Sequence, residues 1–313
     1  MRTVEAPRRH IQANVSAALR EDIGPGDVSA DLIPADTPAQ ARVIVREACV
    51  VCGQPWFDEV FAQLDPRVEV RWLCEEGAKV TPQSVICEIR GPAQAILAGE
   101  RCALNFLQLL SAVATRTRRF VERVKGTRAR ILDTRKTLPG LRVAQKYAVA
   151  VGGGQPHRLG LFDAVMIKEN HIAALGSIER AARLARERQP ELPLIVEAET
   201  LGQVEQALLA HADVILLDNL GTHLLARAVA MRTEHRRYNR GNALLEASGG
   251  ISLENVREIA DTGVDRISIG GLTKNIQAVD YSLRINAGEE DQPGADKAAA
   301  PAGRQSVARP QKP

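Results

Sequence analysis

Positively charged side chains gather near the ends of short apolar runs in the second half of this sequence. They are Arg135, Lys136, His157, Arg158 and Lys168. Guanidinium, ammonium and imidazole groups in this number suit a ligand that carries several carboxylates or phosphates. The sequence therefore indicates a binding site for a polyanionic small molecule.

Two carboxylates and two glycine segments accompany these cations. Glu197 and Asp218 each end an apolar run, and two carboxylates with a substrate phosphate commonly hold Mg²⁺. The last two runs are followed by Ser248–Gly250 and Gly270–Gly271, whose backbone N–H groups can approach a phosphate. A phosphorylated sugar, a metal ion and a second anionic substrate fit this set. Such a site would stabilise the charge that develops as pyrophosphate leaves.

Each feature alone has a simpler explanation. A single carboxylate at a strand end is usually a cap or turn residue, and a glycine pair is usually a turn. The three glycines at 152–154 are no Walker motif, because no GK[ST] follows them. The combination on successive strands favours the functional interpretation.

Six apolar runs, separated by stretches of helical spacing, predict a parallel sheet. The runs cover residues 129–133, 164–168, 193–197, 213–218, 243–247 and 265–269. The helical stretches include residues 177–188, 202–209 and 253–261. Continuous apolar strands are typical of a sheet buried on both faces, and in an α/β barrel their carboxyl ends share one rim. We therefore expect a closed or nearly closed barrel with the charged residues on that rim.

The sequence before about residue 112 mixes strands and helices. We expect a helix from about residue 10, strands at 41–46, 68–72 and 85–90, and a helix at 54–64, which together make a small α+β layer structure. A helical stretch from 93 to about 125 contains one glycine, Gly99, and is expected to include a break. The resulting division is an N-terminal domain at 1–112, a barrel domain at 113–285 and a disordered tail at 286–313.

Composition limits the class of protein. The chain has 313 residues, and 41 Lys and Arg against 38 Asp and Glu give a formal net charge of +3, too small to indicate nucleic-acid binding. It contains no run of 18 apolar residues and no apolar stretch near its start, so neither a membrane span nor a secretory signal is expected. Five scattered cysteines suit reduced thiols, which predicts a cytoplasmic protein.

Several motifs in this order resemble the quinolinate phosphoribosyltransferases, also called decarboxylating nicotinate-nucleotide pyrophosphorylases. They include GERCALNF from Gly99, DTRKT from Asp133, GGGQPHRLGL from Gly152, IKENH from Ile167 and LEASGG from Leu245. The resemblance implies an N-terminal open-faced α+β sandwich and a C-terminal incomplete α/β barrel of about six parallel strands. It also implies the reaction of quinolinate with phosphoribosyl pyrophosphate, giving nicotinate mononucleotide, pyrophosphate and CO₂ in NAD biosynthesis.

The resemblance also assigns roles. It implies that Lys136, Lys168, Glu197 and Asp218 are catalytic, and that Glu197 and Asp218 bind Mg²⁺ as the cofactor. The implied substrate-binding residues are Arg101, Thr134, Arg135, His157, Arg158, Ser248, Gly249, Gly250, Gly270 and Gly271. Members of the family are usually homodimers and sometimes hexamers, and Arg101 is expected to reach into the barrel of the partner subunit.

Some features depart from the family pattern, and three alternatives stay open. Cys102 stands where the family usually has threonine, and the basic connection at 232–242 is longer than usual. The alternatives are an ATP-coupled nicotinate phosphoribosyltransferase, a lyase with a Schiff base on Lys168, and a non-catalytic relative associated with metal transport. The dense cationic set favours a dicarboxylate substrate over nicotinate, and the intact charged set argues against lost catalysis.

Overall fold

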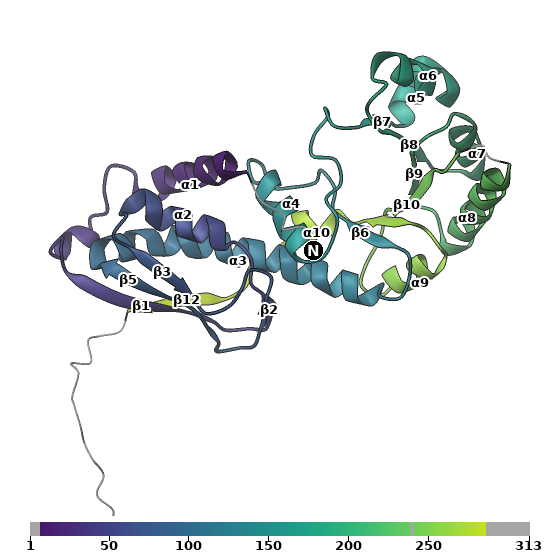
Figure 1. Cartoon of the computed structure of the whole chain (residues 1–313). Helices are drawn as coiled ribbons and strands as arrows, with labels where there is room; N and C mark the ends of the chain where they lie inside the picture. Colours follow the sequence, from purple (N-terminus) through teal and green to yellow (C-terminus); the bar gives the residue numbers. More distant parts are fainter. Residues whose placement is uncertain (1–6, 239–240, 286–313) are drawn as a thin grey trace, which may run out of the picture.

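The computed structural model describes residues 7–238 and 241–285, which form two parts joined by one long helix (Figure 1). The tail predicted at 286–313 lies outside the described residues, as do residues 239 and 240 of the basic connection. The first part is an antiparallel sheet with helices, and the second is a parallel sheet with helices around it.

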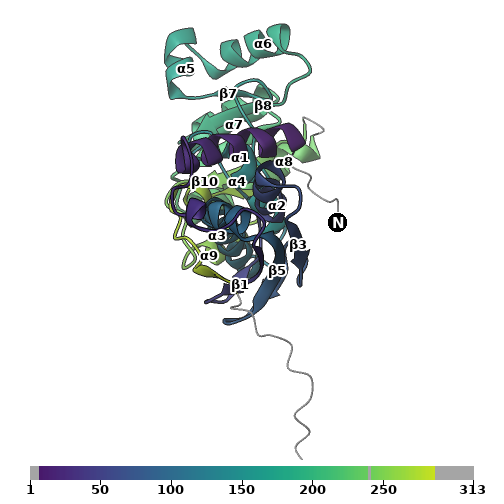
Figure 2. The same cartoon turned by 90° about the vertical axis from the view of Figure 1, so that its left-hand side faces the viewer.

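The N-terminal sheet has the strand order β12-β1-β5-β3. Its strands are β1 (Pro38–Val45), β3 (Glu69–Trp72), β5 (Val85–Pro92) and β12 (Tyr281–Ile285). Helices α1 (Arg8–Ile23), α2 (Gln54–Leu64) and α3 (Ala93–Arg123) pack together beside this sheet (Figures 1 and 2). Short pieces complete this part, namely η1 (Ala30–Leu32), β2 (Cys49–Val50) and β4 (Lys79–Val80).

The two faces of this sheet differ as an open-faced sandwich requires. On β1, Val43 and Val45 are buried in the core beneath the helices. On the other face, Glu88 of β5 forms ion pairs with Arg42 and Arg71 of the neighbouring strands, at 3.4 and 2.6 Å. The predicted sandwich is therefore confirmed.

The last described strand returns to the N-terminal sheet. β12 pairs antiparallel with β1, with Val43 opposite Leu283. The pattern of this segment did not suggest that the chain crosses back after the barrel. Residues 281–285, which the sequence division placed with the barrel, thus complete the sheet of the other part.

Helix α3 connects the two parts as one continuous helix of 31 residues. The expected break is wrong, because Gly99 serves a helix contact instead. A Cβ there would lie 2.6 Å from Cε1 of Phe61 on α2, so the glycine lets the two helices approach closely. By length and composition α3 could cross a membrane, but 61% of its apolar window is buried inside the protein, as in a core helix.

The C-terminal sheet has six parallel strands in the order β6-β11-β10-β9-β8-β7. They are β6 (Arg130–Leu132), β7 (Val165–Ile167), β8 (Leu194–Ala198), β9 (Val214–Asp218), β10 (Leu244–Ser248) and β11 (Arg266–Ser268). Each predicted apolar run contains or overlaps one of them. β6 and β7 form the two ends of the sheet and are not paired with each other, so the barrel is incomplete, as expected (Figure 1).

Helices cover the outer face of this sheet, as its apolar strands require. These helices are α5 (Glu169–Leu175), α6 (Ile178–Arg188), α7 (Leu201–Leu209), α8 (Thr222–Arg237), α9 (Val256–Asp261) and α10 (Gly271–Lys274). Helix α4 (Arg142–Val151) instead packs against α3, and its apolar residues join the core of the N-terminal part. A large apolar core lies between sheet and helices. A smaller apolar cluster of Ala164, Ile195, Val214 and Leu216 comes from the alternate positions of the strands and fills part of the barrel interior.

Candidate active site

The predicted site residues of the barrel lie at one edge of the parallel sheet. Lys168 follows β7, Glu197 is the fourth residue of β8, and Asp218 and Ser248 are the last residues of β9 and β10. Asp218 and Ser248 are paired neighbours in the sheet. Because all six strands are parallel, their carboxyl ends form one rim, as predicted.

An ion pair lies between the ends of β7 and β8. Nζ of Lys168 is 3.0 Å from Oε2 of Glu197, and 44% and 11% of these side chains are exposed. Burial raises the pKa of Glu197, and the charge of Asp218 adds to this rise, while Lys168 opposes it. The carboxylate of Glu197 therefore lies within electrostatic reach of both Lys168 and Asp218.

The two carboxylates fit a divalent cation site. Glu197 and Asp218 offer hard oxygen donors, and Asp218 is close enough for its charge to raise the pKa of Glu197. The structure shows no group of three or more His, Cys, Asp or Glu arranged for a metal among the described residues. A cation here would take its other ligands from substrate oxygens and water, which is the usual manner of Mg²⁺.

The loop after β6 packs against the loop after β11. A Cβ on Gly270 would lie 3.1 Å from Cδ of Lys136 and 3.4 Å from Oγ1 of Thr134. Thr134 Oγ1 also accepts a hydrogen bond of 3.1 Å from the backbone N–H of Lys136. A side chain at position 270 would therefore crowd the lysine, which explains the glycine and places Thr134 and Lys136 beside the last strand.

Arg135 and Arg158 approach each other at the rim. Burial lowers the pKa of Arg158, and the positive charge of Arg135 lowers it further. Arg158 is held by Nη1, which donates to the backbone oxygen of Ala164 at 3.3 Å, and by Nη2, 3.4 Å from Sδ of Met166. Two guanidinium groups so arranged repel each other until an anion lies between them.

A buried ion pair supports the neighbouring chain. Nζ of Lys146 lies 2.8 Å from both oxygens of Asp133, whose side chain is fully buried. Asp133 Oδ1 accepts the backbone N–H of His157 at 2.6 Å, and Lys146 donates to the backbone oxygen of His157 at 2.9 Å. Burial raises the pKa of Asp133 and lowers the pKa of Lys146, and each partner opposes the shift of the other.

Lys146 is not among the predicted site residues, although it lies in the run that leads to the three glycines. The following segment runs beside β6, where the backbone N–H of Gln155 donates to the oxygen of Ile131 at 2.8 Å. This segment occupies the open edge of β6 and brings His157, which is only 8% exposed, under the rim. Helix α4 thus anchors the loop through Lys146.

The glycines after β10 have a geometric reason. Gly249 has φ +91°, and a Cβ there would lie 2.0 Å from Oδ1 of Asn219. Asn219 itself has φ +55°, donates its backbone N–H to the oxygen of Ser248, and donates Nδ2 to Oδ2 of Asp218 at 3.0 Å. Gly250, with φ +57°, has open space around it. The small residue at 249 therefore leaves room for the side chain that orients Asp218.

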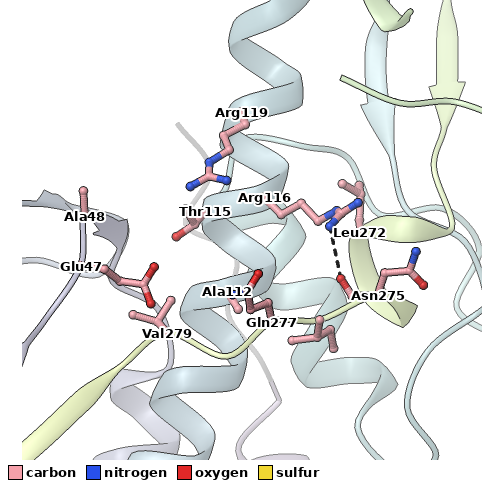
Figure 3. A pocket seen from close by; sticks show the side chains of 11 residues that line it. Glu47, Ala48, Ala112, Thr115, Arg116, Arg119, Leu272, Asn275, Gln277 and Val279 are labelled. Atoms are coloured by element: carbon pink, nitrogen blue, oxygen red, sulfur yellow. Dashed lines mark hydrogen bonds between the residues drawn. The ribbon is translucent and has the colours of Figure 1, made fainter. Parts of the chain in front are cut away.

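Arg116 of α3 contacts the chain that follows β11, on the side of the long helix. Its Nη1 donates to the backbone oxygen of Asn275 at 3.3 Å (Figure 3). A Cβ on Gly271 would lie 3.5 Å from its Nη2. A small cavity of about 140 Å³ lies here between α3 and the segment after α10, with Arg119 and Glu47 in its lining (Figure 3). The long helix thus fixes the glycine loop of the barrel.

Arg101 is the one predicted site residue that does not lie on the barrel. It is on α3, its side chain is 58% exposed, and its Nη2 is 3.9 Å from Glu100. Its neighbours Cys102 and Ala103 belong to the core of the N-terminal part. The thiol of Cys102 points to Asp22, with Sγ 3.7 Å from Oδ2. Within one chain, the structure therefore brings together all the predicted site residues except Arg101.

The fold and the site define an incomplete α/β barrel with charged side chains gathered at the carboxyl-end rim of its sheet. Comparison with known proteins identifies the family. The models of the quinolinate phosphoribosyl transferase N-terminal and C-terminal domains match residues 27–111 and 113–284. This chain belongs to the quinolinate phosphoribosyltransferase family.

Similar proteins cover nearly the whole chain. A probable nicotinate-nucleotide pyrophosphorylase (carboxylating) of Synechocystis is 42% identical over 271 residues, which is 85% of this chain and 90% of the relative. The human nicotinate-nucleotide pyrophosphorylase (carboxylating) is 38% identical over 283 residues, 89% of this chain and 93% of the relative. The solved structure of the nicotinate-nucleotide pyrophosphorylase of Francisella tularensis has a TM-score of 0.85 at 40% identity and covers 90% of this chain and 98% of that one.

A more distant likeness concerns the fold alone. The crystal structure of human nicotinic acid phosphoribosyltransferase has a TM-score of 0.57 at 15% identity, covering 90% of this chain and 74% of that one. The rival interpretation as a nicotinate enzyme therefore shares the architecture, while the sequence similarity favours the quinolinate family.

Proposed function

We propose that this chain converts quinolinate and phosphoribosyl pyrophosphate into nicotinate mononucleotide, pyrophosphate and CO₂, a step of NAD biosynthesis. The observation that carries this proposal is the single rim, where Arg135 and Arg158 lie together and Glu197 lies beside Lys168 and Asp218. Quinolinate is a dicarboxylate and the second substrate carries several phosphates, so both need cations. The family membership supports the same reaction.

The residues divide by ligand. For the carboxylates of quinolinate we assign Arg135, Lys136, His157 and Arg158, with Arg101 of a partner subunit. For the phosphates we assign Thr134, Ser248, Gly249, Gly250, Gly270 and Gly271. Lys136, Lys168, Glu197 and Asp218 form the proposed catalytic set, in which Lys168 contacts the substrates and the two carboxylates face the ribose.

The chemistry needs no side-chain nucleophile. The pyridine nitrogen of quinolinate forms a bond to C1 of the ribose while the bond from C1 to the pyrophosphate oxygen breaks. Glu197 and Asp218 stabilise the positive charge that develops on the ribose. The new pyridinium then accepts the electron pair of the C2–carboxylate bond as CO₂ leaves, and C2 takes up a proton.

The cofactor of this proposal is Mg²⁺. Glu197 and Asp218 would hold it, and the bound ion would neutralise part of the charge of pyrophosphate. The chain's own contribution is to orient these groups, because Asn219 fixes Asp218 and Lys168 fixes Glu197.

One assay tests the reaction and its rivals together. The purified protein is mixed with phosphoribosyl pyrophosphate, Mg²⁺ and either quinolinate or nicotinate, and nicotinate mononucleotide is followed by chromatography. Product from quinolinate alone is expected. Product only from nicotinate would indicate the ATP-linked relative, and borohydride trapping of a carbonyl substrate on Lys168 would indicate the lyase. The absence of product from either substrate would favour a scaffold without this activity.

We also propose a homodimer, or a hexamer built from it, in which Arg101 enters the barrel of the partner subunit. Its exposed position outside the rim supports this. Subunit mixing tests it, because Arg101→Ala and Lys168→Ala inactivate different halves of a shared site. Random exchange of the two inactive proteins should restore about one quarter of the active sites in a two-fold dimer. No recovery after proven exchange would contradict a shared site.

The remaining assignments complete the proposal. We assign residues 1–112 to the N-terminal domain and 113–285 to the catalytic barrel, with β12 of the latter range paired to the N-terminal sheet. We also place the enzyme in the cytoplasm, where its free cysteines would stay reduced.

A further inference from the structure

A fully buried carboxylate lies inside the barrel below the rim. Glu246 is the third residue of β10 and is 0% exposed. Its neighbours Leu245 and Ala247 face the outer apolar core under the helices. Glu246 pairs in register with Leu216, which lies in the inner cluster. The alternation of the strand therefore directs Glu246 into the interior, where a charge needs partners.

Two basic side chains face this carboxylate. Its Oε1 lies 3.1 Å from Nε2 of His157, and its Oε2 lies 2.9 Å from Nε of Arg266 on the neighbouring strand. The contacts of both oxygens depart from ideal hydrogen-bond geometry. Burial raises the pKa of Glu246, but His157, Arg266 and Ser268 outweigh burial and set the pKa below its ordinary value. Glu246 is therefore ionised at neutral pH.

The contact fixes the orientation of the histidine ring. His157 Nδ1 accepts the backbone N–H of Arg158 at 2.7 Å, while Nε2 on the other side of the ring lies 3.1 Å from Oε1 of Glu246. The backbone of His157 is held by Asp133 and Lys146 on the other side. His157 is thus clamped between two buried carboxylates, Asp133 at its backbone and Glu246 at its ring.

The clamp sets the position of the next residue. Arg158 follows His157 directly, gives its N–H to the fixed ring, and extends its guanidinium to Ala164 and Met166 beside Arg135. A ring that turned away from Glu246 would release the N–H of Arg158. The place of the rim guanidinium therefore depends on a carboxylate that is fully buried below the rim.

We propose that Glu246 is a positioning residue for quinolinate binding: it holds the His157 ring under the rim and thereby fixes Arg158. This inference rests on the proposed function. It also means that His157 reaches a ligand through Nε2 only by leaving Glu246.

The main test is Glu246→Gln, which keeps the shape and removes the charge. The KM for quinolinate should rise about 10- to 100-fold, while the KM for phosphoribosyl pyrophosphate and kcat at saturating quinolinate change little. Direct titration of quinolinate in the absence of the second substrate should show the same loss. Glu246→Asp, which restores the charge, should recover part of the affinity.

Asp265→Asn is the matched control. Asp265 is 7% exposed and pairs with Arg232 at 2.6 Å, but it lies at the opposite end of the barrel strands. This variant should lose stability and keep the KM for quinolinate. A KM for quinolinate in Glu246→Gln that equals the wild-type value, or an equal rise in Asp265→Asn, would overturn the proposal.

Two further arms keep the test decisive. If Glu246→Gln does not fold, the charge-balanced double variant Glu246→Gln/Arg266→Met replaces it, and a wild-type KM for quinolinate in this protein would refute the positioning role. The wild-type protein is measured first. Absence of quinolinate binding there would contradict the proposed function itself, whereas a defect in the variants alone supports the role of Glu246.

Discussion

The Asp133–Lys146 pair allows a quantitative prediction about stability. Asp133→Asn keeps the size of the side chain but leaves the ammonium of Lys146 without its counter-charge, and only 6% of the lysine side chain is exposed. Removing one partner of a buried ion pair costs about 3–5 kcal/mol. The amide oxygen can still accept one hydrogen bond, so we expect a loss of about 3 kcal/mol in the free energy of unfolding.

This loss converts into a shift in melting temperature. For 313 residues, an unfolding entropy of about 2.1 cal/mol/K per residue corresponds to about 1.5 °C of Tm for each kcal/mol, which gives a fall of about 4–5 °C. The measurement is thermal unfolding followed by circular dichroism at pH 7, with urea unfolding as a second probe. The double variant Asp133→Leu/Lys146→Met removes both charges and should regain most of the Tm.

The outcomes separate two explanations. If the double variant is stable but has low activity, the pair serves the site through the backbone of His157, which loses its acceptor. If Asp133→Asn melts within about 1 °C of the wild type, the lysine carries no uncompensated buried charge. That result would refute the reasoning for this pair.

Three other predictions concern single positions. Arg135→Ala should abolish quinolinate binding while the Tm is kept, and near-normal product formation by this variant would contradict the site. Gly249→Ala places a methyl group 2.0 Å from Asn219 Oδ1 and should raise the KM for phosphoribosyl pyrophosphate about 10-fold. The control Gly250→Ala, at a similar positive φ, meets no atom within 4 Å and should raise this KM less. Equal KM values for the two variants would argue against the steric cause. The lowered pKa of Glu246 contributes stability that is present above its ordinary pKa of about 4.3 and is lost as the pH falls below that value. The Tm of Glu246→Gln should therefore fall less on acidification than the wild-type Tm, and an unchanged slope of Tm against pH would speak against this assignment.

Much of the fold could be predicted because its strands are short apolar runs that end in polar residues. The run at 213–218 predicts β9 nearly to the residue, since a buried parallel strand tolerates few polar groups. The break expected in α3 is absent, and the one glycine of this helix, Gly99, lies at a close contact with α2 that the sequence does not reveal. The pairing of β12 with β1 was not predictable, since Tyr281–Ile285 does not encode which edge it will join.

The rim residues could be predicted from the sequence, whereas the buried charges inside the barrel could not. Asp218 and Lys168 follow apolar runs, and parallel strands bring their carboxyl ends together whatever the details of packing. Glu246 lies within the predicted apolar run at 243–247. Only the structure shows which side chains of this strand face the barrel interior, and Glu246 is one of them. The clamp on His157 depends on the segment beside β6, which has no regular pattern in the sequence.

The return of the chain through β12 has a consequence for synthesis on the ribosome. Strand β1 cannot acquire its partner β12 until residue 285 has left the exit tunnel, so one of its edges stays unpaired throughout translation of the barrel. Unpaired edges of this kind attract other chains. Removal of residues 281–285 would leave the same edge of β1 unpaired in the finished chain, although all the rim residues precede this segment.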